Sequence, residues 1–155
     1  MIRIVKDLLI LSKLDNKKMD LKIESFSVRG VINSAYEAML IEAKRRSQEM
    51  ELKVHDNIPE IQGDRQRIEQ VFINIISNAI KYTPDKGKIK IEAKPDKEYV
   101  IVSITDTGIG IPKEDLPRIF ERFYRVDKAR SREMGGTGLG LSIAKEIVEE
   151  HGGDI

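Results

Sequence analysis

The strongest constraint on the fold is that two apolar spacings alternate along this sequence. Helices are predicted at 28–48 and 64–82, where apolar residues recur every three or four positions. A last helix is predicted at about 139–150, where two glycines provide a C-terminal stop signal. Segments in which every second residue is apolar are predicted as strands: 21–26, 52–54, 89–93 and 100–104. A polar turn at 94–97 makes the last two a hairpin, and Ser27 is expected to cap the helix that follows it. We therefore predict an α+β fold, a two-layer sandwich with helices on one face of a mixed sheet.

The first fourteen residues are predicted to form a short helix ahead of this sandwich. Its apolar residues Met1, Ile4, Leu8 and Leu11 follow heptad spacing, but two heptads do not establish a coiled coil. The alternative is an amphipathic helix packed on its own domain. Because residues 14–20 are polar and break the pattern, we predict a domain boundary near residue 20, with 1–20 and 21–155 as separate parts.

Composition excludes several classes of protein. With 40% apolar and 34% charged residues, the 155-residue chain is expected to be soluble and globular. Its formal net charge of +1 gives no reason to expect nucleic acid or an anionic membrane as a partner. No cysteine and only two histidines are present, so disulfides and His-rich or thiolate metal sites are not expected. No apolar run approaches the roughly 20 residues that a membrane span needs.

The predicted helix 64–82 has an unusual polar face. Its apolar residues gather on one side, and the opposite side carries Gln70, Asn74, Asn78, Lys81 and Tyr82. An ordinary solvated face is one interpretation. However, asparagine is a poor helix former, and two of them lie one turn apart in mid-helix. Since an amide oxygen suits Mg²⁺, which also takes oxygens from phosphates, this face is a candidate ligand site.

Two glycine-rich segments are candidates for nucleotide binding. The first, DTGIGIP, begins at Asp106, where a predicted strand ends. An aspartate there can be partly buried and can accept a hydrogen bond from an exocyclic amine, while Gly108 and Gly110 permit close approach and positive φ. The second, GGTGLG at 135–140, opens the last helix, whose N-terminal end favours phosphate. Neither matches a P-loop or a dinucleotide fingerprint, and turn-forming glycines without a ligand are the alternative.

These motifs, in this order, resemble the nucleotide-binding boxes of sensor histidine kinases in the GHKL group of ATPases and kinases. The resemblance covers residues 64–153: the N box at Asn74–Tyr82, the G1 box DTGIGIP, the F box FERFYR at 120–125, and the G2 box GGTGLGL. Residues 1–20 resemble the end of the second helix of the dimerisation and phosphoacceptor domain. The resemblance implies the GHKL type of sandwich for residues 21–155.

The resemblance also implies a role for each matching residue. Asp106 would bind the adenine amino group, and Tyr82 would lie against the adenine ring. Asn78 would be the Mg²⁺ ligand. The catalytic residues implied are Asn74, Lys81 and Arg125, with Lys81 reaching the phosphates and Arg125 the γ-phosphate. The G1 loop would pass close to the nucleotide at Gly108 and Gly110. The G2 residues implied in cofactor binding are Gly136, Thr137, Gly138, Leu139 and Gly140. The ATP lid would span 122–134 and carry Lys128, Arg130 and Arg132.

The implied function is a protein-histidine kinase that binds Mg-ATP and passes the γ-phosphate to a histidine and then to a response-regulator aspartate. Asn74 stands where hydrolytic members of the group have a glutamate that activates water, and an amide cannot act as that base. Two alternatives stay open: a module that binds ATP without transfer, and a serine kinase of the anti-sigma type.

Two departures from the family pattern bear on activity. Neither His55 nor His151 lies in an acceptor-histidine context, so both are interpreted as structural, and the fragment is not expected to phosphorylate itself. The expected partners are the dimerisation domain of the same kinase, in a homodimeric parent, and a response-regulator receiver domain. The chain is expected to be the cytosolic portion of a membrane-bound sensor. The family usually continues into one or two further strands, so the sheet is expected to be truncated at Ile155.

Overall fold

The computed structural model describes the backbone of residues 2–16 and 20–155, and their side chains except at 2, 131 and 132. The predicted heptad position Met1, part of the predicted linker at 17–19, and the side chain of Arg132 therefore lie outside the described residues. The chain divides into two compact units. We call Lys22–Gly110 the central unit, and Met1–Leu21 with Ile111–Ile155 the terminal unit. No described helix is long and apolar enough to cross a membrane.

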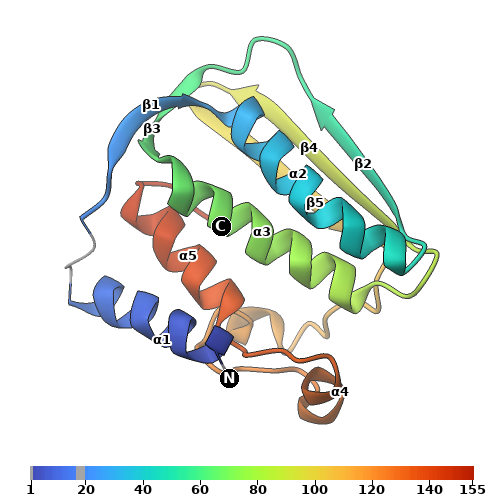
Figure 1. Ribbon diagram of the computed structural model, residues 1–155. Helices are drawn as coiled ribbons and strands as arrows, with labels where there is room; N and C mark the ends of the chain where they lie inside the picture. The colour runs from blue at the N-terminus through green and yellow to red at the C-terminus, as the bar shows by residue number, and fades with distance from the viewer. Residues whose placement is uncertain (1, 17–19) are drawn as a thin grey trace. The chain divides into compact units, whose positions relative to one another are not determined.

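The central unit is a two-layer sandwich, as predicted (Figure 1). Its elements are β1 (Ile23–Ser27), α2 (Val28–Arg45), β2 (Glu49–Val54), β3 (Glu60–Asp64), α3 (Arg65–Tyr82), β4 (Lys88–Asp96) and β5 (Tyr99–Asp106). β2 pairs parallel with β4, and β4 pairs antiparallel with β5, so this three-stranded sheet is mixed. α2 and α3 pack on each other and contact β2 and β5.

The expected strand alternation explains the layers. Ile89, Ile91 and Ala93 of β4 are buried, and the residues between them are not. Along α2 and α3, the buried residues recur at helical spacing and include Val31, Ile32, Ala35, Ile68, Phe72, Ile76 and Ile80. The apolar residues of both layers therefore form the core that holds α3 on the sheet.

The predicted Ser27 cap at the start of α2 is confirmed. The Ser27 hydroxyl accepts a hydrogen bond from the Gly30 amide at 3.4 Å and begins α2. Asp64 caps α3 in the same way, accepting from the Arg67 amide at 3.2 Å. α2 ends at Arg45, three residues earlier than predicted, and α3 ends at Tyr82 as predicted.

The strand β3 and its pairing with β1 were not predicted. β3 pairs antiparallel with β1 in a separate two-stranded sheet, with Ile23 opposite Asp64. Its sequence, EIQGD, contains a single apolar residue, so no alternation marks it as a strand. The hairpin turn is also tighter than predicted, because β4 runs to Asp96, which pairs directly with Tyr99.

The terminal unit contains α1 (Ile2–Asp15), a short 3-10 turn (Leu116–Arg118), α4 (Lys128–Glu133) and α5 (Gly140–Glu150). α1 contacts α5. The predicted heptad stripe is divided: Leu11 is buried, together with Leu14, whereas Ile4 and Leu8 are 40% and 43% exposed. α1 therefore packs one face on its own unit and leaves apolar side chains exposed on another.

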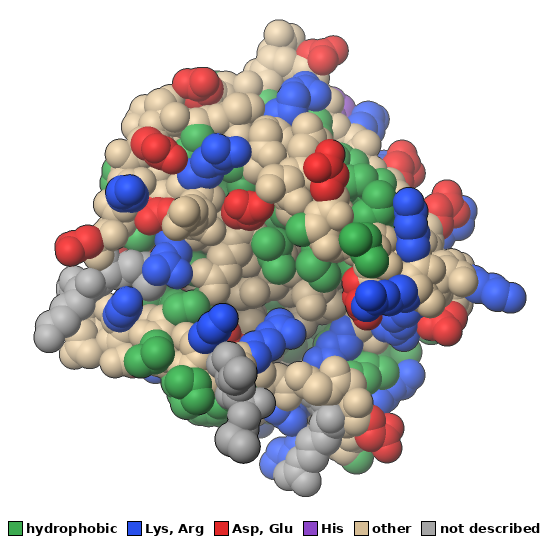
Figure 2. All heavy atoms as spheres, in the orientation of Figure 1, with side chains coloured by type: hydrophobic (Ala, Val, Ile, Leu, Met, Phe, Trp, Pro, Cys, Tyr) green, Lys and Arg blue, Asp and Glu red, His purple; other side chains and the backbone are tan. Residues whose placement is uncertain are grey.

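Charged side chains of both signs are interspersed over the face drawn in Figure 2. Many form local surface pairs, such as Lys88 with Glu49 at 2.9 Å and Arg118 with Glu121 at 3.1 Å. Hydrogen bonding to the Glu49 carboxylate raises the pKa of Lys88, and bonding to Glu121 raises the pKa of Arg118.

Candidate functional site

The polar face of α3 is the first part of the candidate site. Gln70, Asn74, Asn78, Lys81 and Tyr82 are all half-buried, and the residues on the opposite face are buried. The two asparagines lie one turn apart on this face, as the sequence predicts. The Lys81 ammonium is 5.7 Å from the centre of the Tyr82 ring, within the range of a cation–π contact. The central unit thus presents amide, ammonium and aromatic groups along one helix face.

The G1 loop adjoins the end of this helix. The Ile109 amide donates a hydrogen bond to the Tyr82 carbonyl at 3.3 Å. A β-carbon added at Gly108 would lie 2.7 Å from the same carbonyl oxygen and 2.5 Å from Oδ1 of Asp106. The sequence predicts that Gly108 permits close approach to a ligand. In the structure, its lack of a side chain also lets the loop lie against the backbone of α3. Gly110 differs, because it has φ +74° and open space around it.

Asp106 is the last residue of β5, at the start of the loop. Its carboxylate accepts a hydrogen bond from the Gly108 amide at 2.8 Å. The expectation that it is partly buried is wrong, since the side chain is exposed. The physical reason is that β5 is the edge strand of the described sheet, and none of its residues is fully buried. The carboxylate oxygens are accessible to a ligand.

The F box and the G2 box contact each other within the terminal unit. The Phe123 amide donates to the Gly138 carbonyl at 2.8 Å. Phe123 has φ +63° and Gly138 has φ +75°, and a β-carbon on Gly138 would lie 3.0 Å from the Phe123 α-carbon. The Arg125 guanidinium donates to the Gly136 carbonyl. These hydrogen bonds join the two loops directly.

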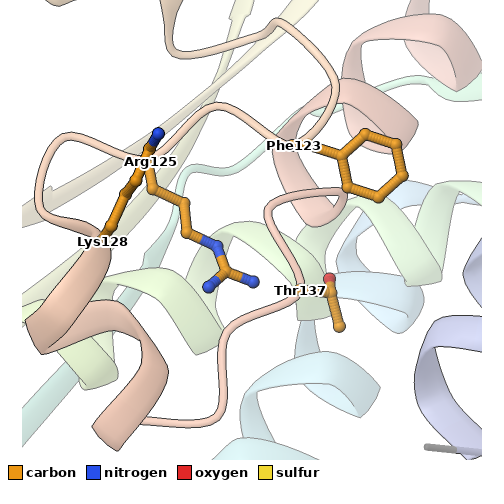
Figure 3. A pocket seen from close by; sticks show the side chains of 4 residues that line it. All are labelled: Phe123, Arg125, Lys128 and Thr137. Atoms are coloured by element: carbon orange, nitrogen blue, oxygen red, sulfur yellow. The ribbon is translucent and has the colours of Figure 1, made fainter.

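These loops line a pocket of about 350 Å³ (Figure 3). Its lining comprises Phe123, Arg125, Lys128 and Thr137. Two cations, a hydroxyl and an aromatic ring are a suitable set for a phosphorylated ligand. The predicted lid residue Lys128 is therefore placed beside the predicted catalytic Arg125, and Arg130 is exposed on α4.

The G2 segment leads directly into α5. Leu139 precedes the helix and makes no side-chain cap, and Gly140 is the first helical residue. The Leu139 side chain is fully buried, so it can contribute only backbone groups to a ligand. The Thr137 hydroxyl accepts from the Leu139 amide at 3.3 Å and contacts the Asp7 carboxylate at 3.2 Å. The contact with α1 has no signal in the sequence.

A second contact from α1 reaches the F box. The Arg122 guanidinium binds both oxygens of Asp15, at 2.5 and 2.8 Å, and Oε1 of Glu146 in α5 at 2.7 Å. Hydrogen bonding to Asp15 and Glu146 raises the pKa of Arg122, and hydrogen bonding from Arg122 lowers the pKa of Asp15. Arg122 is therefore committed to an ion-pair network within the terminal unit.

The two histidines have local partners. His55 Nε2 lies 2.7 Å from Oε1 of Glu92, and this bond is the main cause that lowers the pKa of Glu92. His151 Nδ1 lies 2.7 Å from the Ile147 carbonyl in the last turn of α5. The helix ends there as predicted, because Gly152 has φ +73° and the amides of Gly152 and Gly153 bond back to it.

Comparison with known proteins places these motifs in a family. Residues 63–155 match the family model described as histidine kinase-, DNA gyrase B-, and HSP90-like ATPase. The sensor histidine kinase WalK of Bacillus subtilis (strain 168) is 44% identical over 161 residues, covering 100% of this chain and 26% of the relative. The sensor protein kinase WalK of Staphylococcus haemolyticus (strain JCSC1435) is 43% identical, with coverage of 100% and 26%. The chain thus spans about a quarter of these relatives.

Solved structures of histidine kinases have the same fold. The catalytic domain of ThkA has a TM-score of 0.74 at 31% identity, covering 84% of this chain and 82% of that one. Full-length ShkA in complex with AMPPNP has a TM-score of 0.85 at 28% identity, covering 97% and 31%. ThkA in complex with the response regulator TrrA has a TM-score of 0.71 at 26% identity, covering 96% and 43%. The chain therefore belongs to the family of histidine kinase-, DNA gyrase B- and HSP90-like ATPases, and it is the ATP-binding domain of a sensor histidine kinase.

Proposed function

We propose that this chain binds Mg-ATP and donates the γ-phosphate to a histidine of a dimerisation and phosphoacceptor domain. The phosphate then passes to an aspartate of a response regulator. The observation that carries the proposal is Asn74 on the polar face of α3, one turn from Asn78. An amide cannot take a proton from water, so the face supports ligand positioning without the base that ATP hydrolysis needs.

Recognition of the adenine is assigned to the central unit. The exposed Asp106 carboxylate accepts one hydrogen bond from the Gly108 amide and retains acceptor capacity for an adenine amino group. Tyr82 is half-buried at the end of α3 and supplies an aromatic face for stacking. Gly108 and Gly110 shape the loop between them.

Phosphate-binding residues are assigned in each unit by itself. In the terminal unit, Arg125, Lys128 and Thr137 line the same pocket and favour a phosphate through charge and hydrogen bonding. The backbone of Gly136, Gly138, Leu139 and Gly140 supports the loop before α5, where the helix dipole adds to the attraction of an anion. In the central unit, Lys81 is assigned to the phosphates as well.

Asn78 is assigned as the protein ligand of Mg²⁺. Its side chain is half-buried on the polar face of α3, and its amide oxygen is the type of ligand that Mg²⁺ accepts beside water and phosphate oxygens. The ion, when bound, neutralises charge on the transferring phosphoryl group. The protein's own contribution is to hold the nucleotide in line and to supply the Arg125 cation.

The domain boundaries and partners follow from the same proposal. Residues 1–20 are assigned to the end of the dimerisation helix and its linker, and 21–155 to the ATP-binding domain. The partners are the phosphoacceptor domain of the same kinase, in a homodimer, and a response-regulator receiver domain. The response regulator is supported by the ThkA complex with TrrA. The domain is assigned to the cytoplasm, where ATP is available.

The proposal is tested by mixing the chain with a separately produced phosphoacceptor domain of the same kinase and γ-labelled ATP. Calorimetric titration with ATP, with and without Mg²⁺, is done first. We expect magnesium-dependent binding and an acid-labile label on the acceptor histidine. The D106N variant serves as the matched control, because it retains an acceptor oxygen for the Gly108 amide.

Each other outcome contradicts a specific part of the proposal. Binding of ATP without label on the acceptor domain indicates a nucleotide-binding module. An acid-stable label indicates a serine kinase. No ATP binding by a folded chain removes the kinase function from this fragment.

A further inference from the structure

The carbonyl groups at the C-terminal end of α3 are all hydrogen-bonded, although a helix cannot satisfy its last four itself. The Ala79 carbonyl accepts from the Thr83 amide at 3.0 Å, and the Tyr82 carbonyl accepts from the Ile109 amide at 3.3 Å. The remaining two carbonyls, of Ile80 and Lys81, are satisfied by side chains from another part of the chain.

Those side chains are Arg46 and Gln48, in the turn between α2 and β2. Gln48 Nε2 donates to the Ile80 carbonyl at 2.9 Å and to the Thr83 carbonyl at 2.7 Å. Arg46 Nη1 donates to the Ile80 carbonyl and, at 3.1 Å, to the Lys81 carbonyl. Both residues lie outside every nucleotide motif, so the sequence gives no signal for this role.

The backbone fixes this turn in place. Ser47 has φ +53°, which reverses the chain after α2. The Lys86 amide donates to the Arg46 carbonyl at 3.2 Å, and the Glu49 amide donates to the Gly87 carbonyl at 2.9 Å. The turn after α2 is therefore bonded on both sides to the turn after α3 (Figure 1).

Burial of Gln48 and the positive charge of Arg46 both favour the hydrogen bonds that these side chains donate to the end of α3. Gln48 is only 6% exposed, so its donors must find partners inside the protein. The Arg46 guanidinium lies at the negative end of the α3 dipole and also binds Asp85 at 3.2 Å. A cation that donates to two helix-terminal carbonyls restrains the last turn of α3, the turn that carries Lys81 and Tyr82.

We propose that Arg46 and Gln48 are positioning residues for nucleotide binding. They hold the last turn of α3 and, through the hydrogen bond between the Tyr82 carbonyl and the Ile109 amide, fix the G1 loop. Neither touches the nucleotide. The inference rests on the proposed roles of Lys81, Tyr82 and Asp106, which the restrained segments carry.

The chain offers a matched pair of variants for the test. R46M removes the donors that bind α3 but keeps a long apolar stem. R45M removes the same charge one residue earlier, where the side chain is 73% exposed and pairs with Glu42 at 3.4 Å. R46K restores the charge and donors without the planar fork.

Two readouts are measured on the 155-residue chain. The first is amide hydrogen exchange of Ile109 without nucleotide, which reports the bond to Tyr82 independently of any binding. The second is the Kd for ATP with Mg²⁺. With R46M we expect Ile109 exchange about tenfold faster and ATP binding about threefold to tenfold weaker, as losing one or two hydrogen bonds implies. R46K should recover most of both effects, and R45M should change neither.

Q48M provides a second, independent variant, because it removes every hydrogen bond that Gln48 Nε2 donates at nearly constant side-chain volume. Circular dichroism and the unfolding transition identify any variant that is not folded. If either R46M or Q48M fails to fold, the two readouts are taken from the other variant. Unchanged Ile109 exchange in a folded R46M or Q48M overturns the positioning role. Faster exchange with unchanged ATP affinity also overturns it and leaves a purely structural contact. Failure of the wild-type chain to bind ATP contradicts the proposed function instead, and the exchange result is unaffected.

Discussion

Gly108→Ala is the change that most directly tests how the G1 loop is built. The added methyl group would lie 2.7 Å from the Tyr82 carbonyl oxygen and 2.5 Å from Oδ1 of Asp106. The carboxylate can rotate away, but the carbonyl belongs to the backbone of α3. The loop must therefore move by several tenths of an ångström, and the hydrogen bonds that it makes to Tyr82 and Asp106 are lost or stretched.

The magnitude follows from those two bonds. Each is worth about 1 kcal/mol, and the lower chain entropy of alanine in the unfolded state offsets about 0.5 kcal/mol. We expect a net loss of about 1.5 kcal/mol in the free energy of unfolding, or about 3–6 °C in Tm for a chain of this length. Because Asp106 and Tyr82 lose their relative position, ATP binding should weaken about tenfold.

The assay combines urea unfolding with calorimetric titration of ATP, and Gly110 is the matched control. At Gly110 a methyl group meets nothing, and the cost arises from φ +74° alone, about 1–2 kcal/mol for alanine. Asparagine tolerates positive φ, so Gly110→Asn should recover most of the stability lost in Gly110→Ala. Gly108→Asn should recover none, because its cost is steric.

Either of two results would show that contact with the Tyr82 carbonyl does not require a glycine at position 108. One is a Gly108→Ala variant with wild-type stability and wild-type ATP affinity. The other is recovery by asparagine at position 108, which would mean that backbone conformation, and not contact with Tyr82, requires the glycine.

Three further predictions concern the site and α1. Asp106→Asn should weaken ATP binding about tenfold to a hundredfold, as measured by calorimetry, because a mispaired polar group costs about 1–3 kcal/mol. Asn78→Ala should abolish the Mg²⁺ dependence of ATP binding, measured by the same titration with and without the ion. Arg122→Met should raise the pKa of Asp15 toward 3.8, as measured by NMR titration of its carboxylate, because hydrogen bonding from Arg122 lowers it.

The sign for Asp15 follows from linkage. A carboxylate whose pKa is lowered by folding contributes stability above its unfolded value, and the contribution is lost as pH falls through the folded value. The ion pair with Arg122 should therefore be intact at neutral pH and weaken only below about pH 4. An Asp15 pKa that is the same in wild type and Arg122→Met contradicts this pair. Unchanged ATP affinity in Asp106→Asn, or retained Mg²⁺ dependence in Asn78→Ala, removes the residue from its assigned role.

Most strands, and the helices other than α4, could be predicted because their signal is local. Ser27 caps α2 with its own side chain, Ile89 and Ile91 alternate with polar neighbours, and Gly152 reverses the chain after α5. The strand at 60–64 could not be predicted, since it is stabilised by pairing with β1 and carries one apolar residue. The exposure of Asp106 could not be predicted either, because it depends on which strand lies at the sheet edge.

The amino-acid sequence by itself determined the family, the order of the motifs and the residues that we propose for ligand binding, because those depend on residue type and spacing along one helix or loop. Tertiary structure alone decided what holds them in place. Gly108 is required by a carbonyl 26 positions earlier, and the end of α3 is restrained by Arg46 and Gln48 from a different turn. Contacts between distant segments leave no periodic pattern in the sequence, so only the folded chain reveals them.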